Sequence, residues 1–137
     1  MIFFIPLLFC SCAKKPVYPE APSDGSAVRI ALDQLSLKRP FFHTFYTQDK
    51  KGINYFVLRL DDSVESYFDA CGKCYTKKLG YRQDGEGVFC RACDVSYSVH
   101  DLKDGIGSCY PIKLRGRVEG EYYAIETKDL LRGGKYF

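Results

Sequence analysis

The chain has 137 residues, which is enough for one domain of ordinary size and not for two. Hydrophobic residues make up 46% and aromatic residues 15%, so the domain can bury a core without cross-links. The net charge is +3 and no run of basic residues exceeds two, which leaves no electrostatic footprint for nucleic acid. A nucleic-acid partner is therefore excluded, and the seven cysteines call for an explanation other than simple stabilisation.

Residues 1–12 are uncharged and almost entirely apolar. A helix of this length, at about 1.5 Å per residue, is too short for a hydrocarbon core of roughly 30 Å, but the run suits the apolar part of a signal peptide. Ser11 before Cys12 resembles the cleavage box of bacterial lipoproteins, in which the cysteine becomes lipidated. We therefore predict a signal peptide over 1–12, a lipid on Cys12 and a Lys/Pro-containing tether over 13–26. A signal peptide usually begins with positive charges, and this run has none. The alternative is therefore an apolar N-terminus that packs on its own domain.

The remainder, 27–137, has the turn-punctuated pattern of a mainly β domain. Aromatic and β-branched runs at 41–47, 53–60 and 64–68 are separated by short turns, which predicts a meander. Runs at 112–118 and 122–126 flank Glu119-Gly120-Glu121 and predict another hairpin. We expect a small sandwich-like β domain with one short helix over 128–131, capped by Thr127 and ended by Gly133-Gly134.

Four cysteines have the spacing of a metal–thiolate site. Cys71 and Cys74 form one Cys-x-x-Cys knuckle, and Cys90 and Cys93 form a second one, with 15 residues (75–89) between the two. Two intervening residues allow a tight turn to direct both sulfurs to one point. Backbone N–H groups in the turn can then donate to these sulfurs. The runs 80–83 and 87–89 predict a small hairpin that brings the two knuckles together.

Positively charged residues inside the two knuckles favour the interpretation as a metal site. Four thiolates around a divalent ion leave a double negative charge, which Lys73 and Arg91 are placed to offset. Two structural disulfides are an alternative in an oxidising compartment. A thiol–disulfide redox site is a third, although such motifs usually begin a helix and neither knuckle leads into an obvious one.

The fifth cysteine of the domain, Cys109, stands in a Gly-rich stretch before Pro111. It is a candidate additional or alternative ligand, and a buried thiol is the other possibility. His43 lies in an aromatic run and is expected to be a structural residue, whereas His100 is a weaker candidate for a place near the site. Asp69, just before the first knuckle, is expected to bind backbone groups there.

The motifs from Phe68-Asp69-Ala70-Cys71 through Gly80-Tyr81-Arg82-Gln83 to Gly107-Ser108-Cys109-Tyr110-Pro111-Ile112 resemble the FtrD-like membrane iron–sulfur proteins, found with bacterial iron-uptake systems. The resemblance covers roughly 40–137. It implies an iron-handling site of Cys71, Cys74, Cys90, Cys93 and Cys109. Thiolate spacing alone does not choose between an iron–sulfur cluster, mononuclear iron and zinc.

The expected function is that of an extracytoplasmic, membrane-anchored accessory protein of the bacterial cell envelope. Its metal centre would pass electrons or iron to a membrane iron-transport or redox protein. The alternative is a module in which structural zinc organises loops that recognise another protein. No Ser/His/Asp arrangement, paired carboxylates or phosphate loop stands out, so we do not expect an enzyme.

Overall fold

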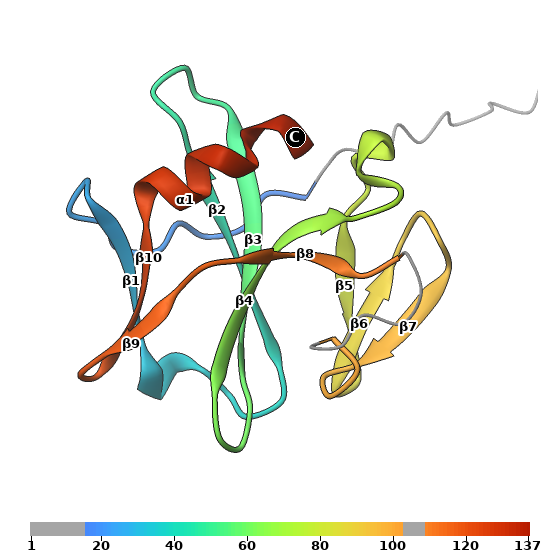
Figure 1. Ribbon diagram of the computed structural model, residues 1–137, viewed down its shortest axis with the longest axis horizontal. Helices are drawn as coiled ribbons and strands as arrows, with labels where there is room; N and C mark the ends of the chain where they lie inside the picture. The colour runs from blue at the N-terminus through green and yellow to red at the C-terminus, as the bar shows by residue number, and fades with distance from the viewer. Residues whose placement is uncertain (1–15, 103–108) are drawn as a thin grey trace, which may run out of the picture.

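The structure, a computed structural model, describes residues 16–102 and 109–137. The described residues form three antiparallel sheets (Figure 1). The terminal sheet contains, in spatial order, β1 (Ala27–Ala31), β10 (Tyr122–Glu126) and β9 (Arg117–Glu119). The central sheet contains β2 (Pro40–Tyr46), β3 (Gly52–Arg59), β4 (Val64–Cys71) and β8 (Pro111–Leu114). The knuckle sheet contains β5 (Tyr81–Asp84), β6 (Gly87–Cys90) and β7 (Val95–Ser98).

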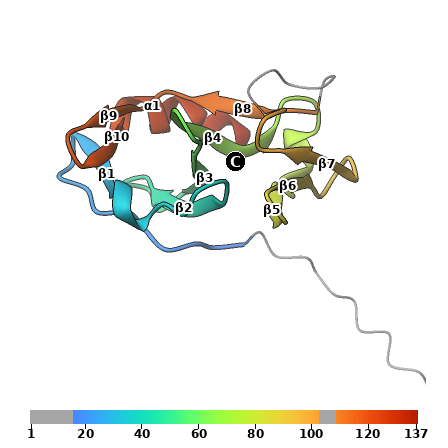
Figure 2. The ribbon, with the colours of Figure 1, turned by 90° about the horizontal axis from the view of Figure 1, so that it is seen from below.

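Strand β3 is buried on both faces and makes the central sheet the middle of the domain. Successive side chains of a strand point to opposite faces. Tyr55 and Val57 pack in one core with the terminal sheet, whereas Phe56 and Leu58 pack in a second core with the knuckle sheet. Figure 2 accordingly shows the terminal and knuckle sheets on opposite sides of the central strands. The apolar run of β3 therefore serves two cores.

Side chains of strand β4 alternate between the same two cores as far as the first Cys-x-x-Cys knuckle. Phe68 and Ala70 belong to the first core, whereas Tyr67 and Cys71 belong to the second. The strand extends three residues beyond the predicted 64–68, as far as Cys71. The first knuckle therefore begins at the end of a buried strand.

The predicted strand over 112–118 is wrong in its continuity. The chain forms β8 and then β9, and these two strands belong to different sheets. Gly116 lies between them, and a Cβ at this position would be 2.5 Å from the Tyr123 hydroxyl oxygen. The bend lets β8 pair with β4 while β9 pairs with β10, as the predicted hairpin requires.

The predicted C-terminal helix is present, but its ends differ from the expectation. Helix α1 spans Thr127–Arg132, and its N-cap is Glu126. Thr127 is the first helical residue, and its hydroxyl donates to the Gly25 carbonyl instead of capping the helix. The α-helix ends at Arg132 with Gly133 as its C-cap, as predicted, but Gly133 has a right-handed φ of −77° and the 3-10 turn η3 (Gly133–Tyr136) follows directly.

The mainly β class, the meander and the knuckle hairpin are confirmed by the three antiparallel sheets. Strands β1 and β7 were not predicted, and neither were the 3-10 turns η1 (Leu32–Gln34) and η2 (Tyr75–Lys77). Across residues 16–102 and 109–137, no helix has both the length and the apolar character needed to span a membrane.

Part of the predicted tether lies against the central sheet. The Asn54 side-chain amide donates to the Pro16 carbonyl, and the Thr44 backbone N–H donates to the Pro19 carbonyl. The Tyr18 ring stacks on Phe42 at a centroid distance of 4.9 Å. Residues 16–19 therefore pack as a strap across β2 and β3.

Candidate metal centre

The two knuckles bring four cysteine sulfurs together. Cys71 ends β4, Cys90 ends β6, and Cys74 and Cys93 lie in the turns that follow. The four Sγ atoms all lie within 4.8 Å of one another. Cys74 Sγ is 3.2 Å from Cys93 Sγ and 3.6 Å from Cys90 Sγ, and 3.9 Å separates Cys71 Sγ from Cys93 Sγ. The predicted four-cysteine cluster is confirmed.

Asp69 and Gly80 fix one knuckle against the other. The Asp69 carboxylate accepts a 2.5 Å hydrogen bond from the Tyr81 backbone N–H, and the Arg91 N–H donates to the Gly80 carbonyl. Gly80 has φ +63°, and a Cβ there would be 2.6 Å from the Asp69 carboxylate oxygens. Asp69 therefore binds backbone as predicted, but at the start of the hairpin between the knuckles. Tyr81 pairs with Cys90 in that hairpin, so this contact sets the position of the second knuckle.

The thiols have divergent acidities because they crowd one another. Burial raises the pKa of Cys71, but hydrogen bonds from the Cys74 thiol, from the backbone N–H groups of Cys74 and Lys73 and from Tyr81 outweigh it and lower the pKa to about 7. Burial and the neighbouring Cys71, Cys93 and Cys90 sulfurs raise the pKa of Cys74 well above its ordinary value. Thiolates this close together repel one another, and a bound cation would offset that repulsion.

The sulfur positions fit one tetrahedral ion. A metal–sulfur bond of about 2.3 Å places tetrahedral sulfurs roughly 3.8 Å apart, close to the separations of 3.2, 3.6 and 3.9 Å. Zinc and iron both accept such a ligand set. Four thiolates are also the ligand set of an iron–sulfur cluster.

Cys109 lies in contact with this cluster. Its Sγ is 2.9 Å from Cys93 Sγ. The segment is held in place because the Tyr81 hydroxyl donates to the Cys109 carbonyl at 3.1 Å and the Gly72 N–H donates to the Tyr110 carbonyl at 2.9 Å. The hydrogen bond to the Cys109 thiol raises the pKa of Cys93 to about 12. The structure therefore brings all five predicted cysteines of the domain together.

The other predicted residues lie at varied distances from the sulfurs. Lys73 is exposed, with its backbone N–H directed to Cys71. Arg91 is also exposed, and its Nε donates to the Tyr81 carbonyl at 3.2 Å. His100 is exposed and is not a member of the four-residue group. His43 is buried in the central sheet, as expected of a structural residue, and Cys12 lies outside the described residues.

Tyr81 is a site residue that the sequence analysis missed. Its side chain is fully buried, and its hydroxyl lies within hydrogen-bonding reach of the Cys71 sulfur and the Cys109 carbonyl. Burial first, and then the Cys71 and Cys90 sulfurs, raise the pKa of Tyr81, so the hydroxyl remains a donor. The sequence did offer one sign of this role, because Tyr81 lies in the predicted hairpin opposite the predicted ligand Cys90.

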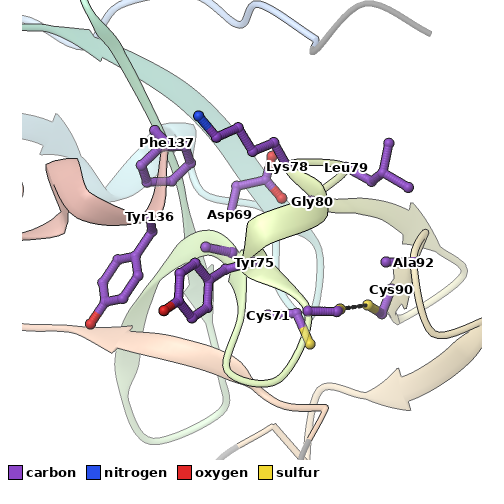
Figure 3. A pocket seen from close by; sticks show the side chains of 12 residues that line it. Asp69, Cys71, Tyr75, Lys78, Leu79, Gly80, Cys90, Ala92, Tyr136 and Phe137 are labelled. Carbon is purple, nitrogen blue, oxygen red and sulfur yellow. Dashed lines mark hydrogen bonds between the residues drawn. The ribbon is translucent and has the colours of Figure 1, made fainter.

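A very small cavity borders the cluster, with a volume of about 10 Å³. Figure 3 shows the Tyr136 and Phe137 side chains on one side of it and Cys71 and Cys90 on the other. The volume is that of about one water molecule. The described part of the cavity therefore offers no space for an organic substrate next to the sulfurs.

A protein-family comparison identifies the family to which the chain with this cysteine cluster belongs. The model described as "Membrane iron-sulfur containing protein FtrD-like" matches residues 38–137. The chain belongs to the FtrD-like family. The match includes the two knuckles, Tyr81 and Cys109, and confirms the resemblance predicted from the motifs. The FtrD-like description implies membrane association and an iron–sulfur centre for the four-cysteine metal site. No curated protein and no solved structure matches the chain.

Proposed function

We propose that this FtrD-like chain is an extracytoplasmic iron–thiolate protein, with an iron–sulfur cluster as the favoured centre, that passes electrons or iron to a membrane partner of an iron-transport or redox system. The observation that carries the proposal is the convergence of four Sγ atoms within 4.8 Å. When bound, an iron centre supplies a one-electron couple. The family description supports iron over other thiophilic metals.

The residues around the sulfurs are suited to holding negative charge. Backbone N–H groups of Lys73 and Cys74 donate to Cys71, and the Tyr81 hydroxyl, which donates to the Cys109 carbonyl, also lies within hydrogen-bonding reach of this sulfur. Such donors stabilise the more reduced, more negative state of a thiolate centre. We propose that the side-chain charges of Lys73 and Arg91 add to this effect, reduced by their exposure to solvent.

The site is accessible to electrons but not to bulky substrates. Cys71 and Cys90 are buried, whereas Cys74, Cys93 and Cys109 are half-buried and face the surface. The cavity beside them holds only about 10 Å³. This combination supports transfer to a docked partner, and we propose that the chain is not an enzyme.

Attachment through a lipid on Cys12 would keep the domain at the membrane. The family description supports membrane association. Cys12→Ala is expected to release the protein from the membrane fraction or to block its processing. Unchanged membrane association, with no lipid mass on the parent protein, would contradict the anchor.

The sulfur spacing also favours a second candidate, because Sγ separations of 3.2, 3.6 and 3.9 Å are close to the roughly 3.8 Å of a tetrahedral zinc site. In that case the metal organises loops that recognise a protein. Anaerobic purification separates the two candidates: an iron–sulfur centre gives a brown protein with iron, acid-labile sulfide and a reversible voltammetric wave. Stoichiometric zinc in a colourless protein without a wave would overturn the proposed function.

A further inference from the structure

A basic groove lies beside the metal centre, between β8 and the C-terminal segment. It has a volume of about 620 Å³, and its walls include Lys113 and Arg115 on one side and Arg132 and Lys135 on the other. Phe68, Ile112 and Leu114 also line it. Lys113 lies in β8 and Arg115 just after it, whereas Arg132 and Lys135 lie in α1 and η3; Figures 1 and 2 show α1 along β8. The groove therefore combines cationic walls with apolar surface.

Two of the four cationic side chains are free to pair with an incoming ligand. Lys113 is paired with Glu65, and Arg132 Nη1 is 2.8 Å from Asp129 Oδ1. Within the part of the chain that the structure describes, Arg115 and Lys135 form no ion pair, and both are exposed. Lys135 Nζ instead lies 5.1 Å from the centroid of the Tyr136 ring. Glu65 and Asp129 also line the groove, so its cations exceed its carboxylates by two and its net charge is positive.

Aromatic rings connect this groove to the cysteine cluster. Tyr75 directly follows Cys74, and its ring packs edge-on against Tyr136 with centroids 5.2 Å apart. Tyr136 lines both the small cavity at the sulfurs and the basic groove. Strand β8 makes the same connection, because Pro111 pairs with Cys71 and the next residue, Ile112, lines the groove. Only a few side chains, among them Tyr75 and Tyr136, therefore separate a molecule in the groove from the cysteine cluster.

We infer that the groove is the docking site of an acidic segment of a partner protein, with carboxylates at Arg115 and Lys135 and apolar side chains against the half-buried Ile112 and Tyr136. This inference rests on the proposed function, since it names the partner surface for the same centre. Complementary charge accelerates and orients encounters without requiring a large interface, as suits a transient redox partner. A hollowed surface with apolar lining fits side chains of a peptide better than the flat plane of lipid headgroups.

The experiment measures fluorescence anisotropy of a labelled peptide of repeated Glu-Leu-Ser units added to the full, metal-loaded chain. We expect saturable binding that weakens as salt rises from about 0.05 M to about 0.5 M. Arg115→Glu and Lys135→Glu should each weaken binding roughly tenfold. Arg39→Glu is the matched control: it makes the same charge change at an exposed residue outside the groove lining, and binding should be unchanged.

Three outcomes would overturn the inference: equal weakening by Arg39→Glu, equal binding of a Lys-Leu-Ser peptide, and failure of the Glu-Leu-Ser peptide to bind. If that failure came with Arg115-dependent binding to phosphatidylglycerol vesicles, the groove would be assigned to an anionic membrane. Because the readout is binding, it is separate from the redox test. A redox wave without peptide binding removes only the groove assignment, whereas peptide binding without a wave removes only the proposed electron transfer.

Discussion

Cys109 Sγ lies 2.9 Å from Cys93 Sγ, closer than the 3.2 Å between Cys93 and its other near neighbour, Cys74. Four thiolates complete a tetrahedral shell, so a fifth thiol in contact with one ligand is in excess. In the metal-free protein this thiol is positioned to react with Cys93.

The first prediction is that mild hydrogen peroxide converts the metal-free protein to a Cys93–Cys109 disulfide. The two thiols lose two protons and two electrons, the sulfur–sulfur bond forms, and the peroxide O–O bond breaks to give two water molecules. Trypsin places each of the five cysteines on a separate peptide, with Cys93 in 92–103 and Cys109 in 104–113. Mass spectrometry should find these two peptides linked. Predominant Cys71–Cys74 or Cys90–Cys93 pairing would contradict the prediction.

The second prediction concerns Gly80, where both the backbone angle and the space require glycine. Gly80→Ala should destabilise the domain by at least about 2 kcal/mol and reduce metal retention, because the new Cβ displaces Asp69 from the knuckle hairpin. Gly85→Ala is the matched control: Gly85 has φ +56° but open space around it, so only the backbone strain of about 1 kcal/mol remains. Urea unfolding and metal analysis measure both effects. Equal costs at the two glycines would refute the role given to the Asp69 contact.

The third prediction is that Tyr81→Phe lowers the reduction potential of an iron centre and weakens metal retention roughly tenfold. The variant keeps the buried ring and removes the hydroxyl that lies within reach of the Cys71 sulfur and the Cys109 carbonyl. Tyr55→Phe is the control, since Tyr55 is equally buried and its hydroxyl has no hydrogen-bond partner among the described residues. Voltammetry and competition with a chelator report the two quantities. A Tyr81→Phe protein that matches the control in both would show that this hydroxyl is only structural.

The fourth prediction concerns pH and the buried His43. Burial lowers the pKa of His43 below its ordinary 6.5, while its Nδ1 bonds the Pro19 carbonyl and its Nε2 has no partner within the described residues. Between the folded and unfolded pKa values the unfolded chain binds the extra proton. The free energy of unfolding should therefore fall as the pH drops below about 6.5.

His43→Asn keeps a donor for Pro19 and should remove this dependence on pH. His100→Asn, at an exposed position, should leave it unchanged. Unfolding free energies between about pH 7 and about pH 5 make the comparison. A parent and a His43→Asn protein with the same slope would contradict the assignment.

The sequence was most informative where one local pattern decided the outcome. The Cys-x-x-Cys spacing and the turn between 84 and 87 were sufficient to predict the cluster and its hairpin, because both depend on neighbours in the chain. Strand β1 was missed because it pairs with β10, almost a hundred residues later, and a strand of five residues carries little periodicity of its own.

The missed details have the same origin. Tyr81 became a site residue through its pairing with Cys90 and its contact with Cys109, and the chain between these elements gives no local sign of either. The break at Gly116 depends on the Tyr123 ring, and the continuation past Gly133 depends on packing of the C-terminus against Phe68. These are tertiary contacts, which override local turn signals.

The most direct test of the account is the iron and acid-labile sulfide content of anaerobically purified protein, compared between the parent, Cys90→Ser and Cys109→Ser. The parent should hold a stoichiometric iron centre. Cys90→Ser should lose it, because removal of one of four thiolates opens the shell, whereas Cys109→Ser should retain most of the metal. Full metal content in Cys90→Ser, or a parent protein that holds no metal, would contradict the central claim.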